Sequence, residues 1–184
     1  MNIGLIILIV AVVLIAIYVA SVYNSLVSLR NKVKDQWAQI DVYLKRRFDL
    51  IPNLVETVKG YAKHEKDTLE DVVKARNSFE SADTPEKEMK AANELTSAVT
   101  KLFALAESYP ELKANENFLN LQNELKETED KISYARQFYN DVVMNYNNKI
   151  EMFPSNIIAS MFKFKQESFF EALESERESV SVKF

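Results

Sequence analysis

Residues 118–153, with the sequence FLNLQNELKETEDKISYARQFYNDVVMNYNNKIEMF, decide the fold. Apolar and a few polar residues recur in this stretch at steps of three and four, with an added step of four near the end, so a single helix would carry them along one face. The positions are Phe118, Leu121, Leu125, Thr128, Ile132, Ala135, Tyr139, Val142, Tyr146, Ile150 and Phe153. A long helix with one such face needs other helices to cover it, so the sequence predicts packed helices.

The composition favours helices over sheets. The chain has 184 residues but only two glycines and four prolines, which leaves little turn chemistry for joining strands. We therefore expect the all-α fold class, without strands. Once one apolar N-terminal stretch is set aside, the remaining length suits one domain with its own core.

The cysteine count and the charge exclude several kinds of site and partner. No cysteine is present, which rules out disulfide bonds, thiolate metal sites and palmitoylation. The formal net charge is -4 at pH 7. Binding to nucleic acid depends on a basic surface that neutralises phosphates, so we expect no nucleic-acid partner.

Residues 3–22 are predicted to form a transmembrane helix. They are aliphatic apart from Gly4, Tyr18 and Ser21, and none is charged. About 20 such residues match the thickness of the hydrocarbon core, and each central aliphatic residue favours insertion by roughly 0.3 to 0.6 kcal/mol. The alternatives are a buried core helix or a cleaved signal peptide, which normally has a basic n-region and an apolar run of about 7 to 15 residues.

The charges that flank this helix predict its orientation. Only Met1 and Asn2 precede it, whereas the basic residues Arg30, Lys32, Lys34, Lys45, Arg46 and Arg47 follow it. The positive-inside rule then predicts a single-pass protein of the cell membrane with a short N-terminus outside and the rest in the cytoplasm. Ala16 and Ala20 form a small-xxx-small pair, which is a weak indication of a homo-oligomer.

Helix signals divide the soluble chain into segments. No glycine or proline occurs between Tyr23 and Pro52, so the first soluble helix continues from the anchor. We expect a break or a sharp kink at Pro52, because Asp49 can cap a new helix with Pro52 in its first turn. The second helix would extend to about Phe79, weakened by Gly60.

Two prolines mark the later helices. Asp83 or Thr84 can cap a third helix with Pro85 in its first turn, and Tyr109 with Pro110 ends it. Pro110 can open the fourth helix, which contains the opening stretch. Four amphipathic helices with short connections predict an antiparallel up-and-down four-helix bundle over residues 23–153.

An aromatic-rich segment and tail, residues 154–184, complete the chain. Its apolar residues are Ile157, Ile158, Met161, Phe162, Phe164, Phe169 and Phe170, with Lys163 and Lys165 among them. They either cap the open end of the bundle or lie in the membrane interface. We expect the Phe153 end of the long helix to point to the membrane if the chain breaks at Pro52, and away if the first two helices are continuous. Residues 174–184 are expected to be a solvated tail.

The residues that carry chemistry do not form a catalytic pattern. His64 is the one histidine and lies in a charged run, where a surface position is expected. The residue three positions before it is Tyr61, so the Glu-x-x-His motif of di-metal bundles is missing. Glu124, Glu127, Glu129 and Asp130 alternate with lysines and are expected on a solvated face. We predict no catalytic, cofactor-binding or metal-binding residues, no cofactor and no enzymatic activity.

Two polar groups have open roles. Arg46 and Arg47 either pair with acids of a neighbouring helix or bind anionic headgroups. The fourth helix ends in a group rich in hydrogen-bonding side chains, which either specify the core or face a partner. Its members are Tyr134, Tyr139, Asn140, Asn145, Tyr146, Asn147 and Asn148.

Several motifs, in order along the chain, resemble the LemA family of bacterial membrane proteins. They are YNSLV at 23–27, WAQIDV at 37–42, KRRFDLIPNLV at 45–55, YPELKA at 109–114, ARQFYN at 135–140 and FPSN at 153–156. The resemblance implies one N-terminal anchor, a short outward N-terminus and a cytoplasmic antiparallel four-helix bundle. It implies no known activity and no catalytic residues. The segment 159–164 departs from the family pattern, in which glycines are expected near positions 160 and 163.

Two functional interpretations remain open. In the first, the protein is a non-enzymatic scaffold or adaptor at the inner membrane face, which binds an unknown protein partner. In the second, it shapes or binds the membrane through the basic groups near Arg46 and Lys163 and the aromatic segment. The partner's identity and the oligomeric state are beyond the sequence.

Overall fold

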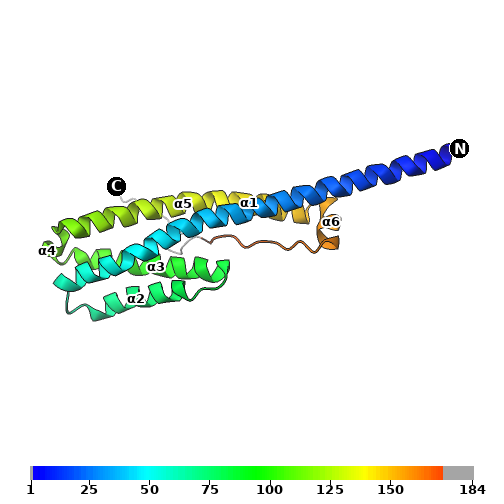
Figure 1. Cartoon of the computed structure of the whole chain (residues 1–184). Helices are drawn as coiled ribbons and strands as arrows, with labels where there is room; N and C mark the ends of the chain where they lie inside the picture. The colour runs from blue at the N-terminus through cyan, green and yellow to red at the C-terminus, as the bar shows by residue number, and fades with distance from the viewer. Residues whose placement is uncertain (1, 172–184) are drawn as a thin grey trace, which may run out of the picture. The chain divides into compact units, whose positions relative to one another are not determined.

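The structure, a computed structural model, describes residues 2–171 and is helical through most of this range (Figure 1). No strand occurs within residues 2–171, which agrees with the predicted all-α class. The predicted solvated tail, residues 174–184, lies outside the described residues. The elements are α1 (Ile3–Tyr61), α2 (Lys66–Glu80), α3 (Pro85–Ala106), α4 (Pro110–Lys113), α5 (Glu116–Glu151) and α6 (Ser155–Met161).

The predicted break at Pro52 is wrong, because α1 continues through it as one helix of 59 residues. Ile51, Leu54 and Val58 are fully buried on one face of this helix. Burying each of them contributes about 1.5–3 kcal/mol, which together exceeds the cost of about 3 kcal/mol for a proline inside a helix. Pro52 itself is exposed. The chain turns instead at residues 62–65, after Gly60.

The signals around Pro85 are confirmed. The hydroxyl of Thr84 accepts a hydrogen bond from the backbone N–H of Lys87 at 3.3 Å, and Pro85 occupies the first position of α3. A threonine cap followed by proline is favourable because proline has no N–H to leave unpaired in the first turn.

The predicted fourth helix is divided in two. Pro110 opens the short helix α4, and α5 begins separately at Glu116. The Oδ1 atom of Asn115 accepts from the N–H of Phe118 at 3.0 Å, which caps α5. The opening stretch thus lies in a single helix as far as Glu151, and Phe153 lies beyond its end.

The buried face of α5 drifts away from the predicted stripe. Phe118, Leu125, Thr128, Ile132, Tyr139 and Tyr146 are buried as expected. Along the second half of the helix, however, the buried positions also include Arg136, Val143 and Asn147. The predicted stripe repeats about every 3.5 residues, whereas an α-helix has 3.6 residues per turn, so the buried face moves by about 20° per heptad.

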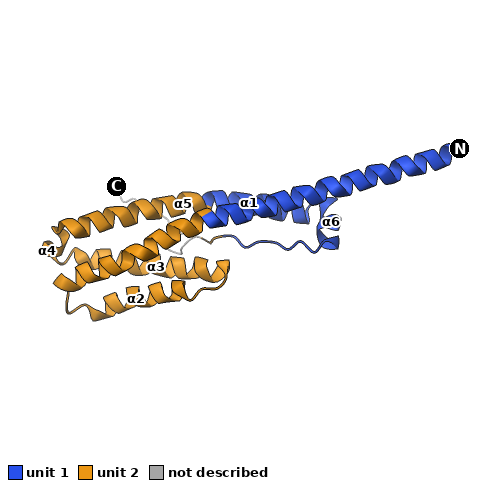
Figure 2. Ribbon diagram, in the orientation of Figure 1, with its two compact units in different colours: residues 1–38, 137–169 blue, residues 39–136, 170–184 orange. Residues whose placement is uncertain are grey.

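The chain forms two compact units (Figure 2). Unit 1 comprises residues 1–38 and 137–169, and unit 2 comprises residues 39–136 and 170–184. In unit 2, side chains of α1, α2, α3 and α5 share one apolar core, with Leu54, Val72, Leu102 and Phe118 among its buried members. The predicted domains 3–22, 23–153 and 154–184 remain predictions.

Unit 1 has a smaller core in which α1, α5 and α6 all contribute buried side chains. They are Val22, Leu26 and Val33 of α1, Tyr139, Val143 and Tyr146 of α5, and Ile158 and Ala159 of α6. The rings of Trp37 and Tyr139 meet edge to face, with centroids 5.7 Å apart. Such pairs add about 0.5–1.5 kcal/mol beyond the area they bury.

Candidate functional site

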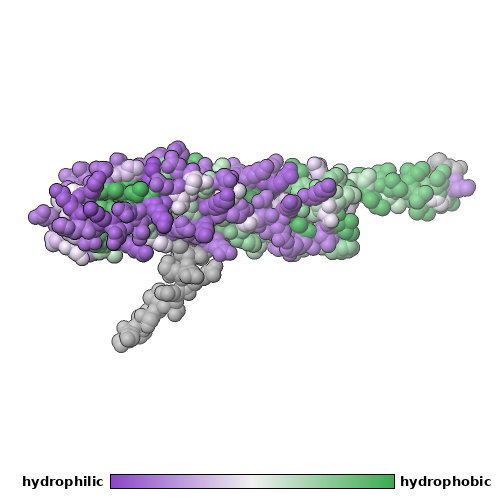
Figure 3. Space-filling model, turned by 90° about the horizontal axis from the view of Figure 1, so that it is seen from below, coloured by the Kyte–Doolittle hydropathy of each residue, from purple (hydrophilic) through white to green (hydrophobic). Residues whose placement is uncertain are grey.

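The apolar N-terminal part of α1 has the length and composition needed to cross a membrane. Its large side chains from Ile3 to Tyr18 are exposed, with Ile3 77 % and Leu14 60 % exposed. Figure 3 shows this apolar surface in green along the N-terminal part of the chain. Exposed aliphatic side chains along several helical turns fit a single-pass membrane protein better than a core helix, which would be buried.

An aromatic cluster in unit 1 lies directly after this apolar run. The ring of Phe162 is 4.7 Å from that of Tyr23, and the ring of Phe164 is 5.8 Å from it. The guanidinium of Arg30 lies over the Phe164 ring at 5.2 Å. The chain after α6 therefore packs against α1 one turn or two beyond the predicted span 3–22. Tyrosine and arginine at such a position are typical of the membrane interface.

The expected direction of the long helix is therefore corrected. A continuous first helix was expected to leave the Phe153 end pointing away from the membrane, yet α1 is continuous and Phe162 contacts Tyr23. The turn at residues 62–65 replaces the predicted one at Pro52, so three helices, α1, α2 and α3, still come before the short helix α4 and α5.

Backbone hydrogen bonds end α6 and aim the chain at Tyr23. The N–H of Phe164 donates to Ala159 O at 2.9 Å and that of Lys163 donates to Ser160 O at 3.1 Å. Lys163 has φ 57°, the left-handed conformation that glycine usually occupies at this point of a helix end. This explains why glycine is expected near position 163: the backbone adopts a left-handed conformation there, which glycine reaches without the steric cost that lysine has.

The side chains of this segment divide between packing and exposure. Ile158 and Ala159 are buried in unit 1, whereas several large apolar residues around them are exposed. The exposed ones are Met152 (60 %), Phe153 (79 %), Ile157 (60 %), Met161 (59 %) and Phe162 (46 %). One side of the segment therefore packs within unit 1, and its other side exposes apolar side chains, among which Phe162 contacts Tyr23. A position of this segment in the membrane interface stays a prediction.

Polar groups of α5 hold the extended chain that follows α6. Asn147 Nδ2 donates to Glu167 O at 2.9 Å, and the N–H of Glu167 donates to Asn147 Oδ1 at 3.0 Å. The hydroxyl of Tyr139 donates to Ser168 O at 3.0 Å. Burial raises the pKa of the Tyr146 hydroxyl, and the carboxylate of Glu167 adds to this effect. Tyr139 and Asn147 thus bind the chain itself, whereas Tyr134 is 65 % exposed.

A buried ion pair lies inside unit 2. Arg47 is 3 % exposed, and its Nη1 is 2.6 Å from Glu129 Oε2 and 2.6 Å from Thr96 Oγ1. Its Nη2 donates to Ala92 O at 2.9 Å. Burial lowers the pKa of the Arg47 guanidinium, and the charge of Glu129 opposes that effect. Arg46 Nη2 lies 3.8 Å from Glu124 Oε2 at the surface, so of the two roles left open for these arginines, pairing with acids is the one that the structure shows.

The remaining candidate residues are at the surface. His64 is exposed in the turn after α1, and Glu127 pairs with Lys131 at 2.6 Å. The predicted solvated acidic face is thus correct for Glu127 and wrong for Glu129, which turns inward to Arg47. Within residues 2–171, histidine, aspartate and glutamate do not gather into a group of three or more that could hold a metal ion.

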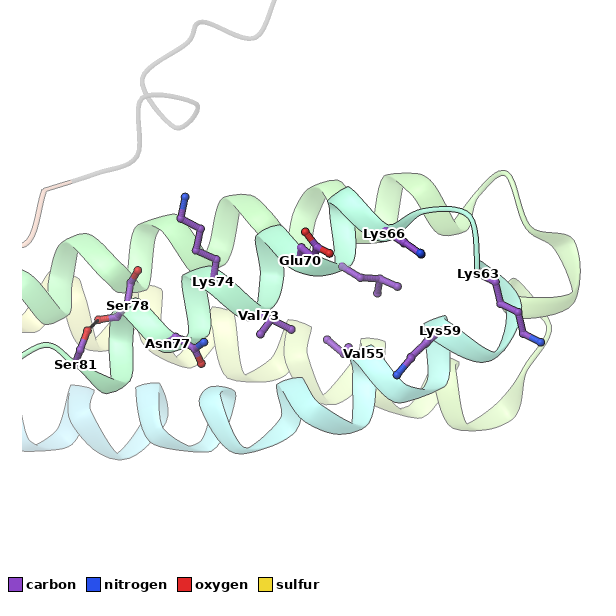
Figure 4. A pocket seen from close by; sticks show the side chains of 11 residues that line it. Val55, Lys59, Lys63, Lys66, Glu70, Val73, Lys74, Asn77, Ser78 and Ser81 are labelled. Carbon is purple, nitrogen blue, oxygen red and sulfur yellow. Dashed lines mark hydrogen bonds between the residues drawn. The ribbon is translucent and has the colours of Figure 1, made fainter.

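An open groove of about 810 Å³ runs between α1 and α2 in unit 2 (Figure 4). Val55, Leu69 and Val73 give it an apolar floor. Its other lining residues are Lys59, Lys63, Lys66, Glu70, Lys74, Asn77, Ser78 and Ser81. Sequence reasoning missed this groove. The available signal was the recurrence of lysines at steps of four and three over residues 59–66, near Val73, which is 40 % exposed in the structure.

A family model described as the LemA family matches residues 36–184. The chain belongs to the LemA family. The match covers the aromatic segment, Arg47 and the groove, and it leaves out the whole apolar run of residues 3–22. The resemblance noted from the sequence motifs is thus confirmed.

Curated relatives of this LemA family member differ in length. Protein LemA of Metamycoplasma hominis is 26 % identical over 160 residues, which cover 86 % of this chain and 73 % of that protein. Magnetosome protein MamQ 2 of Paramagnetospirillum magneticum is 24 % identical, with 81 % and 64 % covered. Magnetosome protein MamQ of Magnetospirillum gryphiswaldense is 22 % identical, with 80 % and 64 % covered. The chain thus spans just under two thirds of the magnetosome proteins. Family and relatives indicate a membrane-associated protein.

Proposed function

We propose that this LemA family protein is a non-enzymatic, membrane-anchored scaffold or adaptor that presents its helices to a protein partner. The groove between α1 and α2 is the observation that carries this proposal. It is open to solvent, has an apolar floor and lies in the unit with the larger core. A concave apolar surface with polar edges is typical of a site that binds a partner segment.

The presenting structure is proposed to be an antiparallel up-and-down four-helix bundle of α1, α2, α3 and α5. The shared core in unit 2 supports this proposal. Contacts between α1 and the α5 end also support it: Arg47 pairs with Glu129, and Asn115 Nδ2 donates to the hydroxyl of Tyr61 at 3.0 Å. From Arg47 to Tyr61 the residue number rises along α1, whereas that of the contacted residue falls from Glu129 to Asn115. This is the pattern expected for two helices that run in opposite directions.

The membrane topology is proposed to be single-pass in the cell membrane, with a short N-terminus outside and the bundle in the cytoplasm. The basic residues after the span support it. The chain has no native cysteine, so single cysteines at Asn2 and at Glu111 can be labelled separately with an impermeant reagent. We expect labelling of intact cells at position 2 alone. Labelling at position 111 alone would show that the topology is the opposite of the one proposed.

Site-specific crosslinking tests the scaffold proposal. A photoreactive residue replaces Val73 on the groove floor or, as a control, the exposed Asn123 of α5. In intact cells we expect one defined protein adduct from position 73 and none of that size from position 123. Adducts that are the same at both positions, or absent at both, would contradict a partner-binding groove.

A second candidate function is membrane shaping or lipid binding, and the exposed apolar side chains around α6 favour it. One of them, Phe162, contacts Tyr23 directly after the predicted span, and Lys163 and Lys165 follow it in the sequence. Amines at headgroup level and aromatics below them stabilise an interfacial position. Purified full-length protein in anionic vesicles, imaged by electron microscopy, tests this function. Deformed vesicles that become round again in a Phe153→Ser, Ile157→Ser variant would support it, and unchanged vesicles with wild-type protein would reject it.

A further inference from the structure

We propose that the groove between α1 and α2 docks an acidic amphipathic helix of a partner protein, with its apolar residues on Val55, Leu69 and Val73. This inference rests on the proposed scaffold function and names the chemistry of the partner.

The charge of the groove is opposite to that of the protein. Four lysines and one glutamate line it, whereas the whole chain carries a net charge of -4. A basic groove attracts acidic segments and repels basic ones, so it favours one class of partner.

The apolar floor requires a segment that presents apolar side chains along one face. Leu69 is 8 % exposed and Val73 is 40 % exposed, four residues apart on the same face of α2. In Figure 4, Val55 and Val73 point into the space between α1 and α2. A helix with apolar residues at i, i+4 and i+7 fits such a floor, as other helix-in-groove complexes do.

The lining residues also predict the length of the docked helix and the end that carries its acidic side chains. Lys59, Lys63 and Lys66 gather at one end of the groove, where α1 ends and α2 begins, whereas Asn77, Ser78 and Ser81 lie at the other end (Figure 4). Along α2, residues 66–81 extend over roughly 22 Å at about 1.5 Å per residue. The docked helix therefore spans about 15 residues, with its acidic side chains concentrated at the lysine end.

Other ligands match the lining less well. Nucleic acid is bound through arginines, aromatic stacking and dense positive charge, and the lining residues include no arginine and no aromatic residue. A lipid headgroup could bind the lysines, but it would not contact both the valines of the floor and the uncharged polar residues at the other end of the groove. These ligands are therefore outcomes of the test.

A binding measurement tests the proposal with full-length protein in nanodiscs of uncharged lipid. The probe is a fluorescent 15-residue peptide with leucines at i, i+4 and i+7 and four glutamates beside them, and a peptide with lysines in place of the glutamates is its control. We expect saturable binding of the acidic peptide that weakens with salt. Lys63→Glu with Lys66→Glu should weaken it about tenfold or more. Lys90→Glu with Lys101→Glu, the same charge change on exposed lysines of α3, should leave it within about twofold.

Three results would overturn the inference. One is equal binding of both peptides, and another is loss of binding in the α3 control variant. The third is binding of the acidic peptide to the Lys63→Glu, Lys66→Glu variant within about twofold of the wild type. The valine floor is checked by Val73→Asp, which should abolish binding while the circular dichroism spectrum stays unchanged.

The crosslinking experiment separates this inference from the proposed function. If a partner is crosslinked at position 73 and mass spectrometry places the adduct on an acidic amphipathic helix, both stand. If the adduct lies on a basic or extended segment or on a lipid, the scaffold function or its lipid-binding alternative survives and the acidic-helix inference fails. If position 73 gives no adduct and the acidic peptide does not bind, both the scaffold function and the inference fail.

Discussion

The guanidinium of Arg47 and the carboxylate of Glu129 lie 2.6 Å apart, and the arginine is almost fully buried while the glutamate is 33 % exposed. Arg47 also donates to Thr96 and to Ala92 O, so one side chain of α1 connects α3 and α5. Because a buried charge without its partner is costly, a packing of these helices that separates Arg47 from Glu129 is unfavourable.

Arg47→Ala should therefore lower the free energy of unfolding by about 3–5 kcal/mol. The neighbouring pair supplies the control: Arg46 and Glu124 are about half exposed and 3.8 Å apart, so Arg46→Ala should cost no more than about 1 kcal/mol. Urea unfolding in detergent, followed by circular dichroism, measures both variants. Equal losses in the two variants would show that burial of Arg47 is unimportant.

Ile132→Asp should unfold the helical core while the protein stays bound to the membrane. Ile132 is fully buried on α5, and a carboxylate there would lose apolar contacts and remain unpaired, a loss of more than about 4 kcal/mol. Tyr134→Asp, two residues away at a position that is 65 % exposed, should melt like the wild type. Helicity, melting and membrane fractionation are measured together, and sharp melting of Ile132→Asp would contradict the packing described for α5.

Lys163→Gly should stabilise the end of α6 by up to about 1 kcal/mol, because glycine reaches the left-handed conformation of this residue without steric cost. Lys165→Gly removes the same side chain nearby, where φ is not positive, and should give no gain. Hydrogen exchange of residues 155–165 is the suitable measurement. A gain of similar size at position 165 would assign the effect to the loss of charge.

Gly60→Ala should stabilise α1 by about 0.5–1 kcal/mol, since a Cβ at this position meets nothing within 4 Å and alanine is the better helix former. Ala62→Gly is the informative counterpart, because Ala62 is buried in the core of unit 2. Thermal melting should shift upward for the first variant and downward for the second. A downward shift in both would mean that the turn at residues 62–65 needs the freedom of Gly60.

The pair Glu88 and Asp41 should make stability depend on pH. Burial and then the charge of Asp41 raise the pKa of Glu88, so its protonated form is favoured in the folded state. This contribution is present below the unfolded pKa and is lost as pH rises through the folded pKa. Asp41→Asn should therefore raise the melting temperature at pH 7, and the gain should shrink toward pH 4. The exposed Asp141→Asn in unit 1 should not show this trend.

Periodicity and capping signals correctly predicted those features of the fold that depend on residues close together in the sequence. The all-α class, the apolar span, the start of α3 at Pro85 and most of the buried face of α5 follow from patterns within a few turns of a helix. The break at Pro52 was wrong because its outcome depends on tertiary burial of Ile51 and Leu54. The sequence gives the free-energy cost of a proline inside a helix, but it does not show how much apolar surface the continuous helix buries to offset that cost.

The candidate site was less predictable for the same reason. Pairing of Arg47 with an acid was expected, but its burial was not, because 82 residues separate it from Glu129. The contact of Phe162 with Tyr23 joins segments near opposite ends of the chain. The groove depends on which side of α2 is left uncovered, and a lysine-rich sequence alone looks the same on any solvated helix.

The side chain of Asn147 pairs with the backbone of Glu167 through two hydrogen bonds, as the backbone of a neighbouring β-strand would. Its amide group accepts from one backbone N–H and donates to the backbone C=O of the same residue, so it recognises a peptide group and ignores the side chain attached to it. The two positions therefore differ in their tolerance of mutation. Many residues can replace Glu167 without loosening this contact, whereas nearly every replacement of Asn147 removes both hydrogen bonds.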